Sequence, residues 1–280
     1  MRIPDKHKKS FKISQSPNGD FNFLVCKIDN KSPFTFLRFS DGEMEIIRNE
    51  ELVIKEGEII WSKGKIKHSY PNFDFKTFSP ESNSDLRADL IESAEFKSDY
   101  YIKGVPTQHN NAILDRNLMV ELNGNSEENL TFADLLLNEN FIKFRKIILP
   151  KLIENSEVYY VGNFRAAPSS VSVSWKHIQV PDNLFLNYQQ TKKEILEKLI
   201  KIPINSIVLL SASSLSNILA HQLFLVRSDL IVLDVGTSIH DLVGLQGGIR
   251  EYHLLLEPYT TKTFIKKIRY KFNKSYKLKW

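Results

Sequence analysis

Short apolar runs of strand length alternate with segments of helical periodicity along most of this 280-residue chain. Alternation of this kind is typical of a parallel sheet covered by helices, because the connection between two parallel strands usually contains a helix. Apolar runs predict strands at residues 21–28, 34–39, 100–105, 157–161, 206–211 and 230–235. Helical spacing predicts helices at residues 43–49, 84–97, 131–138, 140–153, 187–201 and 214–226. The sequence therefore predicts an α/β fold with a mostly parallel sheet.

The remaining segments predict turns and loops within one domain. Residues 62–83 and 123–129 carry clusters of Gly, Pro, Ser and Asn and are predicted to be loops, whereas residues 52–61 predict a small hairpin. Pro150 falls within a helical pattern and is expected to kink or end that helix. No internal repeat or low-complexity block interrupts the pattern, so residues 1–258 are expected to form a single domain.

Composition favours a globular protein of a reducing compartment. Hydrophobic residues make up 42% of the chain and charged residues 25%, which is ordinary for a protein that buries a full core. Cys26 is the single cysteine, which excludes a disulfide within one chain and a cysteine-based metal site. It lies in a predicted strand and is expected to be a small buried residue. No run approaches the roughly 18 apolar residues of a membrane span, and the polar N-terminus lacks the apolar stretch of a secretory signal, so a cytoplasmic protein is expected.

Basic and aromatic residues are concentrated at the C-terminus, in a predicted tail at residues 259–280. Residues 262–280 hold eight Lys or Arg, five aromatic residues and no acid. Such a segment binds anionic lipid headgroups or single-stranded nucleic acid, or remains a solvated tail. A non-enzymatic binding module that works through this tail is therefore one interpretation of the chain.

The segment Arg38-Phe39-Ser40-Asp41-Gly42-Glu43 joins a predicted strand to a predicted helix. Asp41 and Glu43 therefore lie at the carboxyl end of a strand, where open parallel sheets bind their ligands. Two carboxylates one residue apart can share a divalent cation, and that cation can hold a diphosphate. A purely structural interpretation stands beside this one, because Ser40 and Glu43 also fit a capping box in which Asp41 complements the helix dipole.

A turn of small residues, Ser211 to Ser214, follows another predicted strand and precedes a helix. Small side chains let a phosphate approach the free N–H groups at a helix start. Ser213 or Ser214 equally fits a plain helix cap. No Gly-x-Gly-x-x-Gly or Walker pattern accompanies the turn.

Polar side chains follow two further predicted strands. His109 comes after the strand at 100–105, Asp234 lies at the end of the last predicted strand, and Gly236 and His240 follow that strand. The carboxyl ends of parallel strands share one edge of a sheet, so these residues are expected near Asp41 and Glu43. Asp234 equally fits a strand-end carboxylate that binds neighbouring backbone N–H groups. No histidine pair has zinc-ligand spacing, and no Gly-x-Ser-x-Gly elbow of a serine hydrolase is present.

The hexapeptide resembles the Arg-Phe-Gly-Asp-Gly-Glu signature of the GT-D-type glycosyltransferases, which carry an Asp-x-Glu motif in place of the commoner Asp-x-Asp. This chain has Ser40 where that signature has Gly, and its small-residue turn lacks the Gly-Pro of the family. Looser similarity extends over about residues 30 to 245. It includes the strand end Tyr101-Ile102-Lys103-Gly104-Val105-Pro106, the segment His177-Ile178-Gln179-Val180-Pro181, the strand and helix from Ile207 to Leu223, and Leu233-Asp234-Val235-Gly236.

This resemblance implies a Rossmann-like, metal-dependent glycosyltransferase that uses a nucleotide-sugar, expected to be a UDP-sugar, with Mn²⁺ or Mg²⁺. Asp41 and Glu43 match the metal and diphosphate motif residue by residue. The residues expected to bind substrate are Arg38, Phe39, Ser40, Gly42, His109, Ser211, Ser213 and Gly236. Asp234, His240 and Asp241 are candidates for the catalytic base by position alone, and Asp234 and His240 are retained as expected catalytic residues.

The resemblance also bears on the partners of the protein. A glycosyltransferase of this class is expected to act on a glycan or on a lipid-linked acceptor. That favours a peripheral contact of the basic tail with an anionic membrane surface over binding to nucleic acid. The binding-module interpretation remains the alternative.

Overall fold

The computed structural model describes residues 17–55, 58–61, 64–67, 75–106, 111–154, 157–168, 175–245 and 250–256, with residues 263, 266 and 267. A seven-stranded sheet with the order β7-β6-β1-β11-β10-β8-β9 forms its centre, and every neighbouring pair is parallel. The strands are β1 (Phe34–Arg38), β6 (Tyr101–Val105), β7 (Leu130–Phe132), β8 (Val158–Asn163), β9 (Lys176–Val180), β10 (Ile207–Ser211) and β11 (Ile231–Asp234). The predicted α/β fold with a mostly parallel sheet is confirmed.

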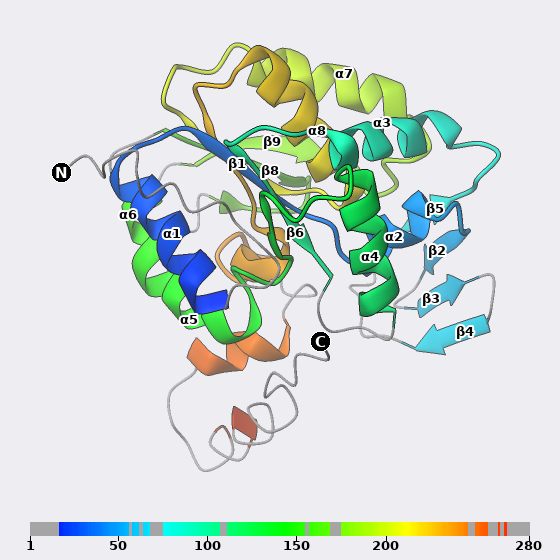
Figure 1. Cartoon of the computed structure of the whole chain (residues 1–280), viewed down its shortest axis with the longest axis horizontal. Coiled ribbons are helices and arrows are strands. Elements are labelled where there is room, and N and C mark those ends of the chain that lie inside the picture. Colours follow the sequence, from blue (N-terminus) through cyan, green and yellow to red (C-terminus); the bar gives the residue numbers. More distant parts are fainter. Residues whose placement is uncertain are drawn as a thin grey trace.

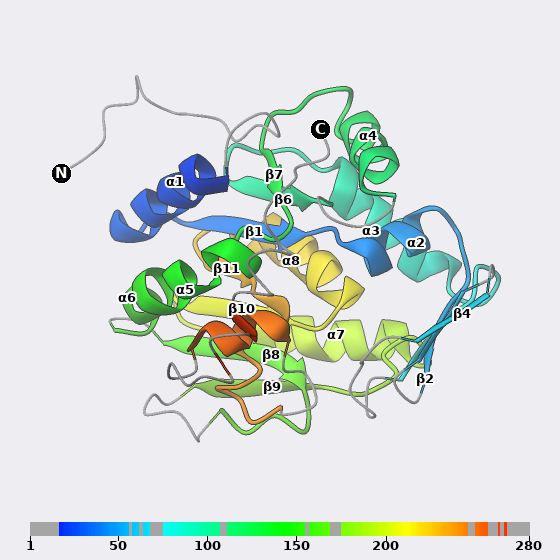
Figure 2. The same ribbon diagram turned by 90° about the horizontal axis from the view of Figure 1, so that it is seen from below.

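Helices cover both faces of this sheet (Figures 1 and 2). One face carries α1 (Pro17–Asp29), α5 (Phe141–Lys143) and α6 (Leu149–Ile153). The other carries α3 (Ser84–Glu95), α7 (Tyr188–Leu199) and α8 (Ser214–Val226). Leu233 of β11 packs in the first core and Val232 in the second. Because alternate side chains of each strand enter the two cores, the strands read as continuous apolar runs.

A second, antiparallel sheet with the order β4-β3-β2-β5 follows α2 (Asp41–Ile47). Its strands are β2 (Leu52–Lys55), β3 (Glu58–Trp61), β4 (Gly64–Lys67) and β5 (Lys76–Phe78). The hairpin predicted at 52–61 is confirmed, since β2 and β3 pair with Lys55 opposite Glu58. The loop predicted at 62–83 is wrong for β4 and β5, which are too short to show a periodic pattern and are defined by pairing with β3 and β2.

Residues 21–28, predicted as a strand, belong to helix α1. Phe21, Leu24 and Ile28 are buried at positions i, i+3 and i+7, and Cys26 is exposed. That is the spacing of one helix face. Further apolar residues between these positions make the segment look like a continuous strand-like run, so the helical spacing is hard to recognise. The expectation that Cys26 is a buried core residue is therefore also wrong.

Residues 131–138, predicted as a helix, begin with strand β7 and continue as turns to a short 3₁₀ helix at Asn138–Asn140. Thr131 pairs with Gly104 of β6, and a Cβ added at Gly104 would lie 2.7 Å from the Cα of Ala133. This close approach between distant segments decides the conformation, and local helical spacing does not reveal it. Helix α4 (Ala112–Leu122) and strand β9 have no counterpart among the predicted elements.

The helical stretch predicted at 140–153 is present, but it is not one regular helix. Helix α5 passes into a π-helical turn at Phe144–Ile148, and α6 follows with Pro150 in its first turn. Proline is tolerated there because first-turn N–H groups have no partner within the helix. The π turn carries Arg145, whose guanidinium reaches the loop after β11.

Two predictions concern residues that the structure describes only in part. The tail at 259–280 and its boundary at residue 258 lie outside the described residues, apart from 263, 266 and 267, and His109 lies outside them as well. Among the residues described, none of the helices combines the length and the apolar composition that a membrane span requires.

Candidate active site

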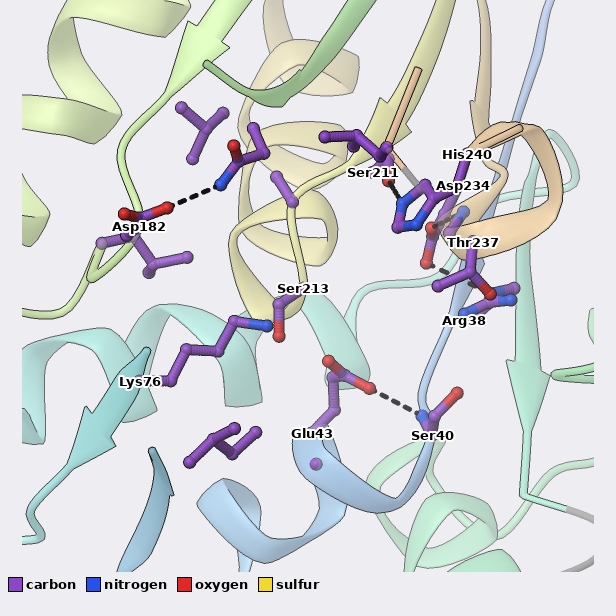
Figure 3. Close-up of a pocket in the computed structure, with 18 of the residues that line it drawn as sticks. Arg38, Ser40, Glu43, Lys76, Asp182, Ser211, Ser213, Asp234, Thr237 and His240 are labelled. Carbon is purple, nitrogen blue, oxygen red and sulfur yellow. Dashed lines mark hydrogen bonds and ion pairs between the residues drawn. The ribbon is translucent and has the colours of Figure 1, made fainter. Parts of the chain in front are cut away.

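A cavity of about 260 Å³ lies at the carboxyl ends of the neighbouring strands β1, β11, β10, β8 and β9 (Figure 3). Strands β2 and β5 of the small sheet complete its lining. The structure brings most of the predicted site residues together here: Arg38, Ser40, Asp41, Gly42, Glu43, Ser211, Ser213, Asp234, Gly236 and His240. Phe39 does not line the cavity, because its side chain is fully buried in the core.

Asp41 and Glu43 begin helix α2 beside this cavity. The Glu43 carboxylate accepts a hydrogen bond from the Ser40 N–H at 3.0 Å, so the capping interaction expected for Glu43 is present. Asp41 is exposed, and its Oδ1 accepts the Gly42 N–H at 3.1 Å. Glu43 is buried, and burial followed by the negative charge of Asp234 raises the pKa of Glu43 to about 7. The cap therefore satisfies one oxygen of Glu43, while Arg38 offsets only part of the negative charge of Glu43, Asp41 and Asp234.

Carboxylates in such surroundings fit a divalent cation. No group of three or more His, Cys, Asp or Glu side chains within the described part of the chain is arranged to hold a metal ion by itself. A pair is sufficient for Mg²⁺ or Mn²⁺, because these ions are commonly held by one or two carboxylates and complete their coordination with water and substrate phosphates. Asp41 and Glu43 therefore fit a cation that is shared with a phosphate-bearing ligand.

An ion pair between Arg38 and Asp234 connects the ends of β1 and β11. Arg38 Nε lies 3.4 Å from Asp234 Oδ2, and Asp234 Oδ1 accepts the Gly236 N–H at 3.0 Å. Gly236 has a φ of +46°, and a Cβ there would lie 2.6 Å from Arg38 Nη2, so glycine is required by both the backbone and the guanidinium. Burial alone would lower the pKa of Arg38, but the negative charges of Asp234, Tyr252 and Glu43 together outweigh burial and raise the pKa. The guanidinium therefore stays charged.

The turn from β10 to α8 is strained at Ser213. This residue has φ +54° and ψ −145°, a region that is costly for any side chain with a Cβ. The Ser213 hydroxyl makes no capping hydrogen bond; instead, the Ala212 N–H donates to Ser216 Oγ at 2.9 Å. The first N–H groups of a helix have no partner within it, and the N-terminus of α8 lies at the cavity. Lys76 of β5 points across the cavity toward Ser213 (Figure 3).

Ser211, at the end of β10, lies opposite His240, which follows the short 3₁₀ helix Gly236–Ile239 after β11. Ser211 Oγ is 3.0 Å from His240 Nε2, and both residues line the cavity (Figure 3). The Tyr160 hydroxyl packs behind them against Gly162, where a Cβ would lie 2.2 Å from it. Burial raises the pKa of Tyr160 to about 12, so the phenol stays protonated.

The loop that carries His240 is fixed by its next residue, Asp241. Arg145 Nη1 donates to both carboxylate oxygens of Asp241, at 2.7 and 2.9 Å, and His253 Nε2 lies 3.4 Å from Oδ1. Burial would raise the pKa of Asp241, but the hydrogen bonds from His253 and Arg145 outweigh it and lower the pKa to about 2. Asp241 is therefore bound into the scaffold and does not line the cavity.

The far end of the cavity, at β9, holds residues that were not predicted. Asn163 Nδ2 donates to Asp182 Oδ1 at 2.9 Å, and Arg165 forms an ion pair with the same carboxylate. Burial opposes the ionisation of Asp182, but the hydrogen bonds from Arg165 and Asn163 prevail and lower its pKa. Val180 and Leu184 add apolar side chains at this end of the cavity. We call these residues, with Asn163 and Asp182, the β9 end.

Of the cavity residues that were not predicted, Asp182 could have been identified from the sequence and Lys76 could not. Asp182 comes two residues after the end of β9, so the rule that ligands bind at strand ends would identify it once residues 176–180 were recognised as a strand. Lys76 lies in a segment whose sequence resembles a loop, and no local pattern marks it.

The arrangement of strands and helices resembles that of solved structures. A structure described as a new glycosyltransferase, domain of unknown function 1792, from Streptococcus sanguinis superposes with a TM-score of 0.53 and 16% identity, over 85% of this chain and 86% of that chain. The fold is that of this glycosyltransferase. A second structure, described as domain of unknown function 1792 with a distinct glycosyltransferase fold, gives a TM-score of 0.48 and 13% identity over 79% of this chain and 82% of that chain. Neither a family model nor a curated protein matches the sequence.

Proposed function

We propose that the protein is a glycosyltransferase that moves a sugar from a nucleotide-sugar, expected to be a UDP-sugar, to a glycan or lipid-linked acceptor. The observation that carries this proposal is the meeting of two features in one cavity: the Asp41–Glu43 pair and the N-terminus of α8. The first suits a cation and the second suits an anion. A nucleoside diphosphate with its metal ion requires both, and the glycosyltransferase fold agrees with such a ligand.

The diphosphate of the donor is proposed to lie between the start of α2 and the start of α8. The N–H groups of the α8 N-terminus would bind its oxygens, and Lys76 and Arg38 would add positive charge from β5 and β1. When bound, a Mn²⁺ or Mg²⁺ ion held by Asp41 and Glu43 supplies charge neutralisation at the leaving diphosphate. Gly42 and Ser40 shape the backbone of this region.

The β9 end of the cavity suits the nucleoside. Val180 and Leu184 offer apolar contact to a planar base, and the ionised Asp182 offers an acceptor for ribose hydroxyl groups. Four inter-strand spacings separate β1 from β9. At about 4.8 Å each they span roughly 19 Å, which is long enough for an extended nucleoside diphosphate.

Binding and turnover measurements test this function. UDP-glucose, UDP-galactose and UDP-N-acetylglucosamine are each added with Mn²⁺, and the melting temperature, calorimetric affinity and UDP release are recorded. At least one donor is expected to bind and raise the melting temperature, and a chelator is expected to abolish turnover. Asp41→Asn and Glu43→Gln should each abolish turnover in a folded protein. The matched control is Glu51→Gln, which removes an exposed carboxylate just beyond α2 and should keep full activity.

Two results would count against the proposal. The absence of binding by any nucleotide-sugar in the presence of Mn²⁺ or Mg²⁺ would refute a donor site in this cavity. Full turnover in either carboxylate variant would refute the metal-binding role. Binding to anionic vesicles without any binding of nucleotide-sugar would instead support the binding-module alternative.

A further inference from the structure

We propose that Ser211 and His240 form the proton-accepting pair of the transfer reaction, and that the acceptor hydroxyl binds beside them, at the end of the cavity opposite Asp182. The inference rests on the proposed function and extends it from the donor to the acceptor and to the stereochemical course. A dedicated base that deprotonates the acceptor supports a single direct displacement at the anomeric carbon. Such a displacement inverts the configuration of that carbon.

The geometry of the pair is that of a hydroxyl bound to a base. Ser211 Oγ lies 3.0 Å from His240 Nε2, within the range of a strong hydrogen bond. With the ring proton on Nδ1, the serine hydroxyl donates to Nε2, and its oxygen retains capacity to accept a hydrogen bond from a sugar hydroxyl. Both side chains line the cavity, so an acceptor can reach them.

The carboxylates that line the cavity have other partners. Asp234 is paired with Arg38, and Asp182 is held by Arg165 at the β9 end. The two carboxylates at the start of α2 are the expected cation ligands. Of the titratable side chains that line the cavity in the described part of the chain, His240 is thus placed to accept a proton from a neutral hydroxyl.

The position of the pair also matches the proposed donor. Ser211 is two residues before Ser213, at whose turn the diphosphate is proposed to bind, and β10 and β11 are neighbouring strands. With the nucleoside at the β9 end, the transferred sugar points away from Asp182. It then lies toward Ser211 and His240, which is where an acceptor hydroxyl must attack.

The scaffold holds His240 in this orientation from two sides. Arg145 binds both oxygens of Asp241, the residue that follows His240. Tyr252 forms a hydrogen bond with Thr237, at the other side of His240 in the same loop. A base that is fixed before the substrate binds needs no rearrangement during the reaction.

The proposed step balances in atoms and charge. The acceptor oxygen forms a bond to the anomeric carbon as the bond from that carbon to the diphosphate oxygen breaks, and the electron pair leaves with the diphosphate. The acceptor proton passes to Ser211 Oγ while the serine proton passes to His240 Nε2. The resulting imidazolium later releases its proton to water.

Product configuration is the first test. The three UDP-sugars named above are α-linked, and the wild-type product of whichever is used should be β-linked by proton NMR. An α-linked product would overturn the inference while leaving the proposed function intact. Failure of every UDP-sugar to bind would instead overturn the proposed function itself.

Variants provide the second test. His240→Ala should lower kcat by about 100-fold or more, leave the affinity for UDP and Mn²⁺ unchanged, and recover part of its kcat when free imidazole is added. Ser211→Ala should lower kcat less and should keep the β-linked product. His177→Gln, which alters a half-buried histidine of β9 bound to the Gly162 carbonyl, is the matched control and should keep wild-type kcat.

Rescue by imidazole separates a lost base from a damaged fold, because a structural defect gains nothing from it. Wild-type kcat in His240→Ala would overturn the inference, and so would a loss of kcat matched by an equal loss of UDP affinity. If His240→Ala does not fold, the product configuration and the Ser211→Ala kcat decide the question.

Discussion

Replacement of Glu43 by Gln is expected to make the protein more stable and inactive at once. Glu43 is 7% exposed, and burial with the nearby charges of Asp234 and Asp41 raises its pKa from 4.5 to about 7. Near pH 8 and without a divalent cation, the Glu43 carboxylate is ionised. Its ionisation costs more free energy in the folded protein than in the unfolded chain, so the charge destabilises the folded state. Glutamine has the same shape without the charge, and its amide oxygen can still accept the Ser40 N–H.

The magnitude follows from the pKa difference of Glu43. A rise from 4.5 to about 7 corresponds to about 3 kcal/mol, because each unit is worth about 1.4 kcal/mol. The folded state binds the additional proton, so the contribution of Glu43 to stability is fully present below about pH 4.5, is lost as the pH rises to about 7, and is level above that. Glu43→Gln should not show this loss. The two proteins should be equally stable near pH 4.5, and the variant should be more stable by up to about 3 kcal/mol near pH 8.

Urea unfolding with a chelator, across this pH range, measures the difference. Added Mn²⁺ should then stabilise the wild type near pH 8 and leave Glu43→Gln unchanged, because a ligand stabilises only the protein that binds it. Glu51→Gln again serves as the control and should follow the wild type. If Glu43→Gln is instead less stable by about 1 kcal/mol at every pH, Glu43 acts as a helix cap and the charge argument is refuted.

Three further substitutions test the scaffold and the proposed diphosphate site. Burial raises the pKa of Asp20 from 3.8 to about 6, so wild-type stability should fall by about 3 kcal/mol between about pH 4 and pH 6, and Asp20→Asn should remove this fall. Parallel urea-unfolding curves of the two proteins over that range would contradict this. Ser213→Gly should raise the free energy of unfolding by about 1 kcal/mol, because glycine adopts the strained conformation of the β10–α8 turn without cost, and a lower melting temperature would contradict it. Ser213→Glu should weaken UDP binding by repulsion, and unchanged calorimetric affinity would place the diphosphate elsewhere.

The strands of the central sheet were predictable because most of them are buried on both faces. Residues 207–210 and 231–233 are continuous apolar runs for that reason, and both lie in strands close to the predicted bounds. Helix α1 was not predictable from the same criterion, because its apolar residues are dense enough to imitate a buried strand. Strand β7 owes its conformation to the close passage of β6 at Gly104, which is a contact between segments far apart in the sequence.

The candidate site was predictable where it depends on strand ends. Arg38 and Ser40 line the cavity while Phe39 between them enters the core, and the alternation of side chains along extended backbone would have separated them. Lys76 reaches the cavity because the antiparallel sheet β4-β3-β2-β5 packs beside it, and no local sequence pattern predicts where that sheet packs. The contact of Ser211 with His240 likewise depends on the adjacency of β10 and β11, and sequence order alone does not fix which strands are neighbours.

The ion pair between Arg38 and Asp234 joins residues 196 positions apart, so Arg38 is synthesised well before its partner. At roughly 5–20 residues per second, β1 leaves the ribosome roughly 10 to 40 s before β11 does. Throughout that interval β1, a mostly apolar strand of the central sheet, has an open edge of the kind that pairs with other chains. A nascent chain interrupted before β11 would contain the complete Asp41–Glu43 motif but not the carboxylate that anchors Arg38 beside it. The Asp41–Glu43 motif is therefore made long before the site is complete, and the site is completed only once β11 has been synthesised.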